Sequence, residues 1–185
     1  MSATNRGTVR KPHDFYATPI SAIEKILQNF NFDHMTILEP SAGNGNIIKV
    51  LREKYIDTNI TAMEIREEEK DNLQQVSDTV IIGDFLTTEF TDTYDVIIGN
   101  PPYSLAKEFM EKCFTVAHEN TKIIMLLRTA FLESKARYSF WQQYPLSGLY
   151  VLSQRPSFTG KGTDATSYSW FLWDNGCQNQ LIKVI

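Results

Sequence analysis

Apolar runs that alternate with helical patterns constrain the fold of this chain more than any other feature of its sequence. Seven short runs are apolar throughout rather than at every second position, which is typical of strands buried on both faces of a sheet. The intervals between most of them carry apolar residues at helical spacing. The alternation predicts one α/β domain over residues 1–185, with a mostly parallel sheet and helices on both faces.

The expected elements follow the chain in order. Strands are expected at residues 35–40, 60–65, 79–84, 94–100, 121–130, 148–153 and 167–174. Helices are expected at residues 18–30, 46–55, 67–76, 104–119 and 131–144. Parallel sheets bind ligands beyond the carboxyl ends of their strands, near the point where the strand order reverses. The residues at those ends therefore form the candidate site, namely 39–45, Glu64, Asp84 and Asn100.

The first strand end carries the sequence EPSAGNG, in which Gly43 and Gly45 allow the backbone to approach a ligand closely. The third glycine of a GxGxxG motif is missing, so a pyrophosphate cradle is not indicated. Glu64 ends the next strand about twenty positions later, where an acid binds ribose hydroxyls in Rossmann-like folds. A tight turn and a solvated carboxylate are the structural alternatives, but together the two features favour adenosine binding.

The third strand end carries Asp84 and Phe85. An aspartate at this place can accept a hydrogen bond from the amino group of an aromatic base, and a phenylalanine ring offers a face to the base. A helix-capping aspartate beside a core phenylalanine explains the same two residues equally well on local grounds.

The fourth strand end reads IIGNPPYSLAKEF, and the strand must stop at Asn100 because neither proline can donate to a sheet ladder. The Asn100 side-chain oxygen and the Pro101 carbonyl could both accept hydrogen bonds from one amino group, which would direct the nitrogen lone pair toward an electrophile. Fixed dipoles of this kind stabilise the charge that develops in a transition state and can accelerate a reaction strongly. Tyr103 could stack on the substrate ring. Taken alone, the same tetrapeptide is more often a turn.

With these motifs, the chain resembles the amino-methyltransferases that use S-adenosylmethionine, in particular the small phage-type DNA N6-adenine methyltransferases. DFYATP at residues 14–19 is similar to the family's N-terminal cofactor motif, EPSAGNG to the glycine motif, and NPPY to the catalytic motif. RPSF at 155–158 and TSYSWFLW at 166–173 resemble its late region. The resemblance implies a Rossmann-like class I domain whose seven-stranded sheet has an antiparallel C-terminal strand.

The resemblance also implies a set of site residues. The catalytic residues would be Asn100, Pro101, Pro102 and Tyr103. The cofactor would contact Tyr16, Thr18, Pro19, Glu39, Pro40, Ser41, Gly43, Gly45, Glu64, Ile65, Asp84, Phe85 and Asn100. The substrate would contact Tyr103, Arg155, Phe158 and Lys161, with Phe158 facing the target base. The implied activity is methyl transfer from S-adenosyl-L-methionine to the N6 amine of a flipped-out adenine in DNA.

Charge and length bear on the partner. Net charge is −4, whereas a DNA-binding protein usually shows a basic stripe. Residues 1–13 form a basic arm, which we expect to be flexible, and no separate target-recognition domain is expected. The arm and the loop at 155–166 are the remaining surfaces for DNA. We therefore expect a short or relaxed target sequence, or a homodimer in which a second subunit supplies contacts.

Other classes of function are less consistent with the sequence. Histidines and cysteines fall at no metal-ligand spacing, so no metal is expected. The chain has no apolar run of membrane-spanning length and no signal peptide, which predicts a cytoplasmic protein in a bacterial or phage-infected cell. RNA adenine N6 methylation and protein glutamine N5 methylation remain as alternatives. A NAD-dependent dehydrogenase would explain neither the incomplete glycine motif nor NPPY.

Overall fold

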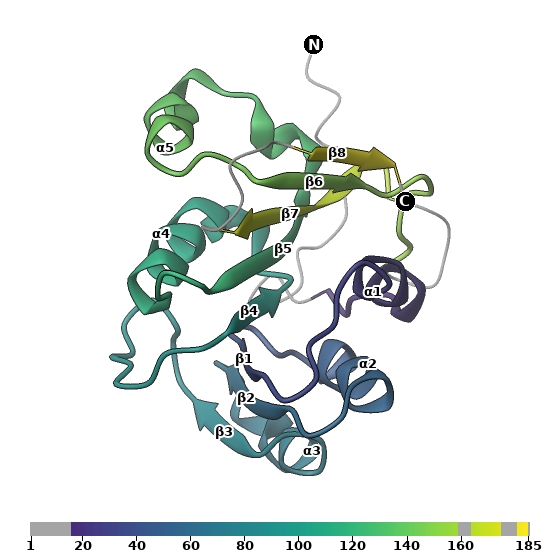
Figure 1. Cartoon of the computed structure of the whole chain (residues 1–185), viewed down its shortest axis with the longest axis vertical. Helices are drawn as coiled ribbons and strands as arrows, with labels where there is room; N and C mark the ends of the chain where they lie inside the picture. The colour runs from purple at the N-terminus through teal and green to yellow at the C-terminus, as the bar shows by residue number, and fades with distance from the viewer. Residues whose placement is uncertain (1–15, 159–163, 175–180, 185) are drawn as a thin grey trace.

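The computed structural model describes residues 16–158 and 164–174, together with the backbone of 181–184. Its centre is one eight-stranded sheet with the strand order β3-β2-β1-β4-β5-β7-β6-β8 (Figure 1). The strands are β1 Thr36–Glu39, β2 Asn59–Glu64, β3 Thr79–Ile82, β4 Val96–Gly99, β5 Lys122–Arg128, β6 Gly148–Val151, β7 Tyr168–Asp174 and β8 Leu181–Val184. The basic arm at 1–13 lies outside the described residues.

The sheet is mixed because of one strand. β7 pairs antiparallel with β5 and β6, and every other pairing is parallel. The mostly parallel sheet is thus confirmed, and so is the antiparallel course of the last predicted strand, which is β7, but the sheet has eight strands where the sequence predicted seven. The additional strand is β8, which pairs with β6 at the edge of the sheet. β1 lies between β2 and β4, so the strand order reverses there and opens a ligand-binding crevice.

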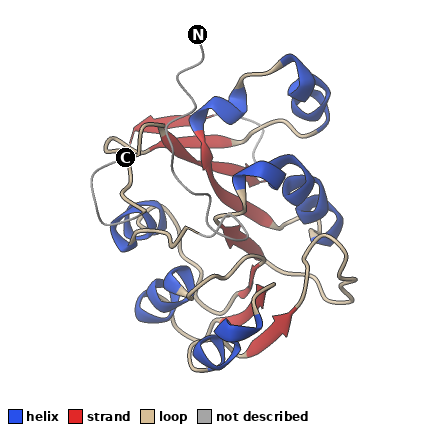
Figure 2. Cartoon of the chain, turned by 180° about the vertical axis from the view of Figure 1, so that it is seen from behind, coloured by secondary structure: helices blue, strands red, loops and turns tan. Residues whose placement is uncertain are grey.

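Helices cover both faces of the sheet, as predicted. α1 Ile20–Leu27, α2 Asn46–Lys54 and α3 Lys70–Gln74 lie on one face, and α4 Ala106–Val116 and α5 Tyr138–Gln143 lie on the other (Figures 1 and 2). Neighbouring strand residues divide between two cores: Ile98 packs with the α1 and α2 cluster, and Ile97 with the α4 and α5 cluster. None of the helices in the described segments is long and apolar enough to cross a membrane.

The helix expected at 131–144 is shorter than predicted. Two 3₁₀ turns, η4 Thr129–Leu132 and η5 Lys135–Arg137, precede α5. The Ser134 hydroxyl accepts the Ala136 N–H at 3.1 Å, and such local bonds compete with helix continuation. The Arg137 guanidinium donates to the Phe131 carbonyl at 2.8 Å, which satisfies an oxygen that an uninterrupted helix would have used. The remaining 3₁₀ turns are η2 Glu67–Glu69 and η3 Tyr103–Leu105.

A polar clamp ties α2 to the start of the neighbouring strands. The Arg52 guanidinium donates to the Val76 carbonyl at 2.9 Å and the Thr58 carbonyl at 2.6 Å, and it pairs with Asp78. Asp78 also accepts the Ile60 N–H at 2.6 Å. Burial alone would raise the pKa of Asp78, but the hydrogen bonds from Ile60 and Arg52 outweigh it and lower the pKa. The clamp therefore favours the ionised carboxylate in the folded protein.

This clamp predicts a pH-dependent stability. Because the folded-state pKa of Asp78 lies below its unfolded value of about 3.9, the carboxylate stabilises the fold above that pH and loses its effect as the pH falls through the folded pKa. We expect Asp78→Asn to lower the free energy of unfolding at neutral pH, and the difference from wild type to shrink in acid. Solvent screening keeps the effect modest. Urea denaturation of both proteins from about pH 7 to about pH 3 measures it; a pH-independent difference would contradict the account.

Candidate active site

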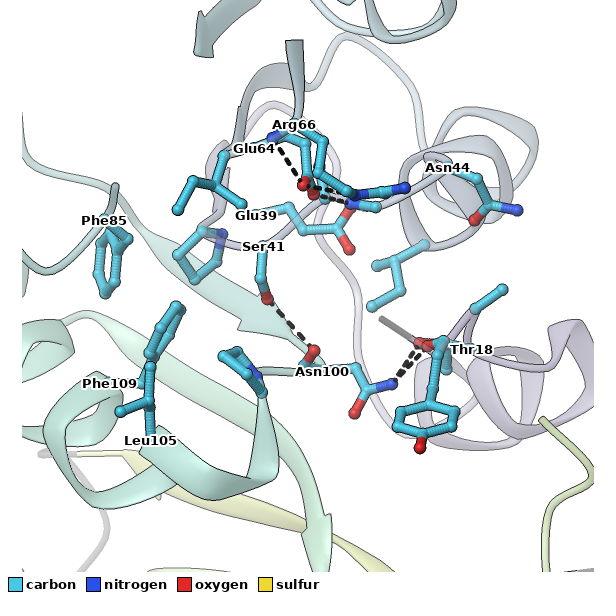
Figure 3. A pocket seen from close by; sticks show the side chains of 18 of the residues that line it. Thr18, Glu39, Ser41, Asn44, Glu64, Arg66, Phe85, Asn100, Leu105 and Phe109 are labelled. Atoms are coloured by element: carbon cyan, nitrogen blue, oxygen red, sulfur yellow. Dashed lines mark hydrogen bonds and ion pairs between the residues drawn. The ribbon is translucent and has the colours of Figure 1, made fainter. Parts of the chain in front are cut away.

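A cavity of about 360 Å³ opens at the carboxyl ends of β1, β2 and β4, the crevice expected from the strand order. The volume lies in the range of small-molecule sites. The cavity is lined by Tyr16, Ala17, Thr18, Glu39, Pro40, Ser41, Ala42, Gly43, Asn44, Asn46, Ile47, Glu64, Ile65, Arg66, Gly83, Asp84, Phe85, Asn100, Pro102, Ser104, Leu105 and Phe109. Most of the cofactor residues predicted from the sequence are therefore brought together here (Figure 3).

Two predicted cofactor residues do not line this cavity. Gly45 precedes α2 with φ of 76°, and a Cβ there would lie 3.3 Å from both Leu73 and Val76. A glycine at 45 therefore serves the turn and the packing of α3. Pro19 is the N-cap residue of α1 and lines a second cavity, which is formed with residues from 152–157. Gly43, with φ of 57°, does line the main cavity.

Glu64 is held in place from two directions. One of its carboxylate oxygens accepts the Gly43 N–H at 2.7 Å, and the other accepts the Arg66 N–H at 3.1 Å and the Arg66 Nε at 2.9 Å. Arg66 in turn pairs with Glu69 at 3.0 Å. The acid predicted to bind ribose is thus oriented by the glycine turn of the neighbouring strand. Sequence analysis did not single out Arg66, although it is the cation nearest to Glu64 in the acidic run after β2.

The buried carboxyl group of Glu39 has an oxygen that no hydrogen bond from the described residues satisfies. The residue is 2% exposed, and its Oε2 is buried without a hydrogen-bond partner among the described residues. Burial, and then the negative charge of Glu64, raise the pKa of Glu39 well above its ordinary value. A buried carboxylate is costly unless a positive group or hydrogen bonds compensate it. The cavity is therefore suited to a ligand that brings a positive charge next to Glu39.

The Asn100 side chain has a fixed orientation. Its Nδ2 donates to the Tyr16 carbonyl and to Thr18 Oγ1, both at 3.1 Å (Figure 3). A carbonyl can only accept, so the amide nitrogen must face Tyr16 and the amide oxygen must face away. That oxygen, Oδ1, is buried and has no partner among the described residues. The Asn100 carbonyl also accepts the Ser41 hydroxyl at 3.3 Å.

The side of the cavity opposite Thr18 is apolar. Phe85 is buried and packs against Phe109 with a ring-centroid distance of 5.1 Å, and Leu105 is exposed beside them (Figure 3). Asp84 lines the cavity, and it also accepts the Leu86 N–H at 3.0 Å. Residues 85–87 form a turn, so no helix follows Asp84 and the helix-capping alternative is wrong. From the sequence, Leu105 and Phe109 are only two residues of the helix predicted at 104–119, because helical spacing does not distinguish core from cavity wall.

An aromatic cluster lies beside the catalytic motif. Tyr16, Tyr103, Phe158 and Tyr168 contact one another with ring-centroid distances from 5.1 Å to 6.4 Å. The Arg128 guanidinium lies 5.2 Å from the centre of the Tyr103 ring. Two of the predicted substrate residues, Tyr103 and Phe158, therefore meet. The other two do not join them: Arg155 lines the second cavity, and Lys161 lies outside the described residues.

Comparisons of sequence identify a family. A model of the Eco57I restriction-modification methylase family matches residues 20–150. Type II methyltransferase M.CvrRI of Paramecium bursaria Chlorella virus XZ-6E is 29% identical over 126 residues, which covers 57% of this chain and 33% of the viral protein. The chain thus spans about a third of the length of this curated relative.

Solved structures share the fold. The protein PH1948 of Pyrococcus horikoshii superposes with a TM-score of 0.69 over 98% of this chain and 95% of its own, at 15% identity. A dimethyladenosine transferase of Plasmodium falciparum gives 0.62 over 86% and 63%, at 15% identity. A TehB-like SAM-dependent methyltransferase of Corynebacterium glutamicum gives 0.56 over 82% and 86%, at 10% identity. Identities this low show the fold alone.

Fold, family and cavity agree. The sheet is that of class I methyltransferases, and S-adenosyl-L-methionine is the cofactor of such enzymes. The cavity fits this cofactor because the unpartnered Glu39 Oε2 offers a place for a positive charge, and the anchored Glu64 ends β2, where Rossmann-like folds carry an acid that binds ribose. The chain belongs to the Eco57I restriction-modification methylase family.

Proposed function

We propose that this chain methylates the exocyclic N6 amine of adenine in DNA. The observation that carries the proposal is the Asn100 amide, whose oxygen is buried and unpartnered among the described residues at the end of β4. An oriented acceptor of this kind suits an amino group. The family match and the similarity to a Type II methyltransferase support DNA as the substrate.

Residues of the main cavity would hold the cofactor. Glu39 would accept from its ammonium group, Glu64 from its ribose hydroxyls, and Phe85 would pack against its adenine. When bound, S-adenosyl-L-methionine supplies an electrophilic methyl carbon on a sulfonium. The walls from Leu105 and Phe109 would exclude water from the adenine end of the site.

Asn100 would act on the amine of the substrate. Its Oδ1 would accept one N–H hydrogen, and the Pro101 carbonyl would accept the other. The Pro102 carbonyl is already used, because it accepts the Leu105 N–H at 3.0 Å. Two acceptors would draw the hydrogens out of the ring plane and localise the nitrogen lone pair, an effect that grows as the nitrogen becomes tetrahedral. The bonds to Tyr16 and Thr18 would keep the acceptor from rotating away.

A base must leave the helical stack to reach Asn100. Tyr103 and Phe158 would receive it, since flipped bases stack on aromatic side chains. The Tyr103 hydroxyl is buried without a described hydrogen-bond partner, and burial raises its pKa well above the ordinary value. The ring of Tyr103 rather than its hydroxyl is therefore the part proposed to contact the base.

A methyl-transfer assay tests the substrate class. We expect labelled methyl from S-adenosyl-L-methionine to enter double-stranded DNA, and nucleoside analysis of the product to yield N6-methyladenine. Label in RNA but not in DNA would favour the RNA alternative, and label in a protein glutamine would replace the nucleic-acid account altogether. Heat-denatured DNA serves as the control for strand preference.

The Glu39 carboxyl predicts a pH-dependent cofactor affinity. Because the pKa of Glu39 is raised in the free protein, a cationic ligand binds best after the carboxyl has lost its proton. Affinity should be full above that pKa and weaken as the pH falls through it. Glu39→Gln should weaken binding by roughly 1–3 kcal/mol and flatten this pH dependence. Calorimetry across pH decides; an unchanged profile in Glu39→Gln would rule out this role.

The Asn100 acceptor predicts a specific loss of rate. At saturating cofactor, Asn100→Ala should lower the single-turnover rate by roughly 10²–10³, the scale for one pre-organised polar group. Loss of the bonds to Tyr16 and Thr18 should also weaken cofactor binding, and saturation removes that effect from the measured rate. Tyr103→Phe is the matched control and should stay active, because it removes only an unpartnered hydroxyl. Rapid-quench kinetics on cofactor-saturated variants measure both. A near-normal rate in Asn100→Ala would show that the NPPY sequence is only a turn and contradict its catalytic role.

A further inference from the structure

We propose that the second cavity of the protein binds a backbone phosphate of the DNA beside the target nucleotide. The proposal rests on the proposed function, because it assumes a nucleic-acid substrate. The cavity has a volume of about 190 Å³ and lies between α1 with its N-cap, from Pro19 to Lys25, and the segment 152–157. The volume leaves room for a phosphodiester group, and the side chains around it decide what it can hold.

The lining of this cavity is cationic. Lys25 comes from α1, Arg155 comes from the segment after β6, and among the described residues no aspartate or glutamate lines the cavity. Neither cation forms an ion pair with a carboxylate of the described residues. In a chain of net charge −4, a cavity whose described lining holds two cations and no acid is a specific feature rather than a general property of the surface.

Neutral donors accompany the two cations. Ser21 and Gln154 line the cavity, and so does Ser157, whose Oγ is buried without a hydrogen-bond partner among the described residues. The Arg155 Nη1 donates to the Ala165 carbonyl at 3.2 Å, which limits the motion of the guanidinium. Hydroxyl, amide and guanidinium groups are the side chains that contact phosphate oxygens in protein–DNA complexes. The helix dipole of α1 adds a small favourable potential.

The position of the cavity fits a phosphate close to the target base. Pro19 lines it, and the preceding residue, Thr18, lines the cofactor cavity and binds Asn100. Ser157 lines it, and the following residue, Phe158, belongs to the aromatic cluster. The phosphate cavity thus adjoins both segments that frame the proposed base site. A base turned toward Tyr103 would leave its own backbone at this edge of the protein.

DNA affinity and its salt dependence test the proposal. Binding of a fluorescent duplex of mixed sequence would be measured with S-adenosylhomocysteine present, for wild type, Lys25→Ala and Arg155→Ala. Each substitution should weaken DNA binding about tenfold and reduce the slope of log affinity against log salt by about 1, as expected for one lost phosphate contact. KM for DNA should rise in parallel, and Lys25→Arg should restore binding because it retains the charge.

Matched controls separate this idea from a general charge effect. Lys54→Ala removes one positive charge at the far end of α2 from the active site, and it should leave the salt slope unchanged. Cofactor affinity of each variant shows that it is folded. Equal DNA affinity and slope in Lys25→Ala, Arg155→Ala and wild type would overturn the phosphate site. The phosphate site would also be overturned if inorganic phosphate stabilised wild type at constant ionic strength while both variants bound DNA as tightly as wild type does.

The proposed function and the phosphate site fail in different ways. If wild type methylates DNA but the two variants bind it normally, the phosphate site is wrong and the function stands. If wild type methylates no nucleic acid, the function is wrong, and the phosphate site falls with it. If only RNA is methylated, the same variants would be measured on RNA, and a loss of affinity there would contradict the assignment of the cavity to DNA.

Discussion

Two hydrogen bonds from one amide hold the candidate active site together. Asn100 follows β4, and its Nδ2 donates to Tyr16 and Thr18, more than eighty positions earlier in the chain. Asn46 donates to the Thr18 carbonyl at 2.9 Å, so the same segment is also fixed to α2. Ser41 completes the link by donating to the Asn100 carbonyl. The amide therefore fixes the wall of the cofactor cavity. Because its nitrogen is used in this way, its oxygen has no partner among the described residues, and this is the oxygen that we propose accepts from the substrate amine.

A second constraint is electrostatic. Glu39 and Glu64 end adjacent parallel strands, so their carboxyl groups meet at one edge of the sheet. Glu64 is compensated by the Gly43 N–H and by Arg66, whereas Glu39 has an oxygen that no described group satisfies. Burying an acid in this way lowers the free energy of unfolding of the protein, and a role in ligand binding explains why it is there. Glu64 is thus oriented by its partners, whereas the carboxyl group of Glu39 is the one that we propose pairs with the positive charge of the cofactor.

Much of this arrangement could be predicted from the sequence. Apolar runs predicted the sheet and its covering helices, and strand ends predicted Glu64, Asp84 and Asn100, because strand ends in parallel sheets are set by topology. The resemblance to amino-methyltransferases added residues such as Tyr16 and Thr18. Side-chain roles were harder. The sequence could not tell that Gly45 faces α3 or that Pro19 faces another cavity, since both depend on tertiary packing. β8 was missed because a short run near the chain end has little pattern, and helix spacing could not reveal that Ser134 interrupts 131–144.

Two neighbouring cavities would serve one methyl-transfer reaction. Cofactor, target base and flanking phosphate would each occupy a separate place around the segment that runs from Tyr16 to Pro19. A crystal structure with S-adenosylhomocysteine and an adenine-containing oligonucleotide tests the central claim most directly. The account predicts the adenine amine within about 2.7–3.2 Å of Asn100 Oδ1, a hydrogen-bond distance. An adenine amine bound away from Asn100, or an Asn100 amide turned with its nitrogen toward the base, would contradict it.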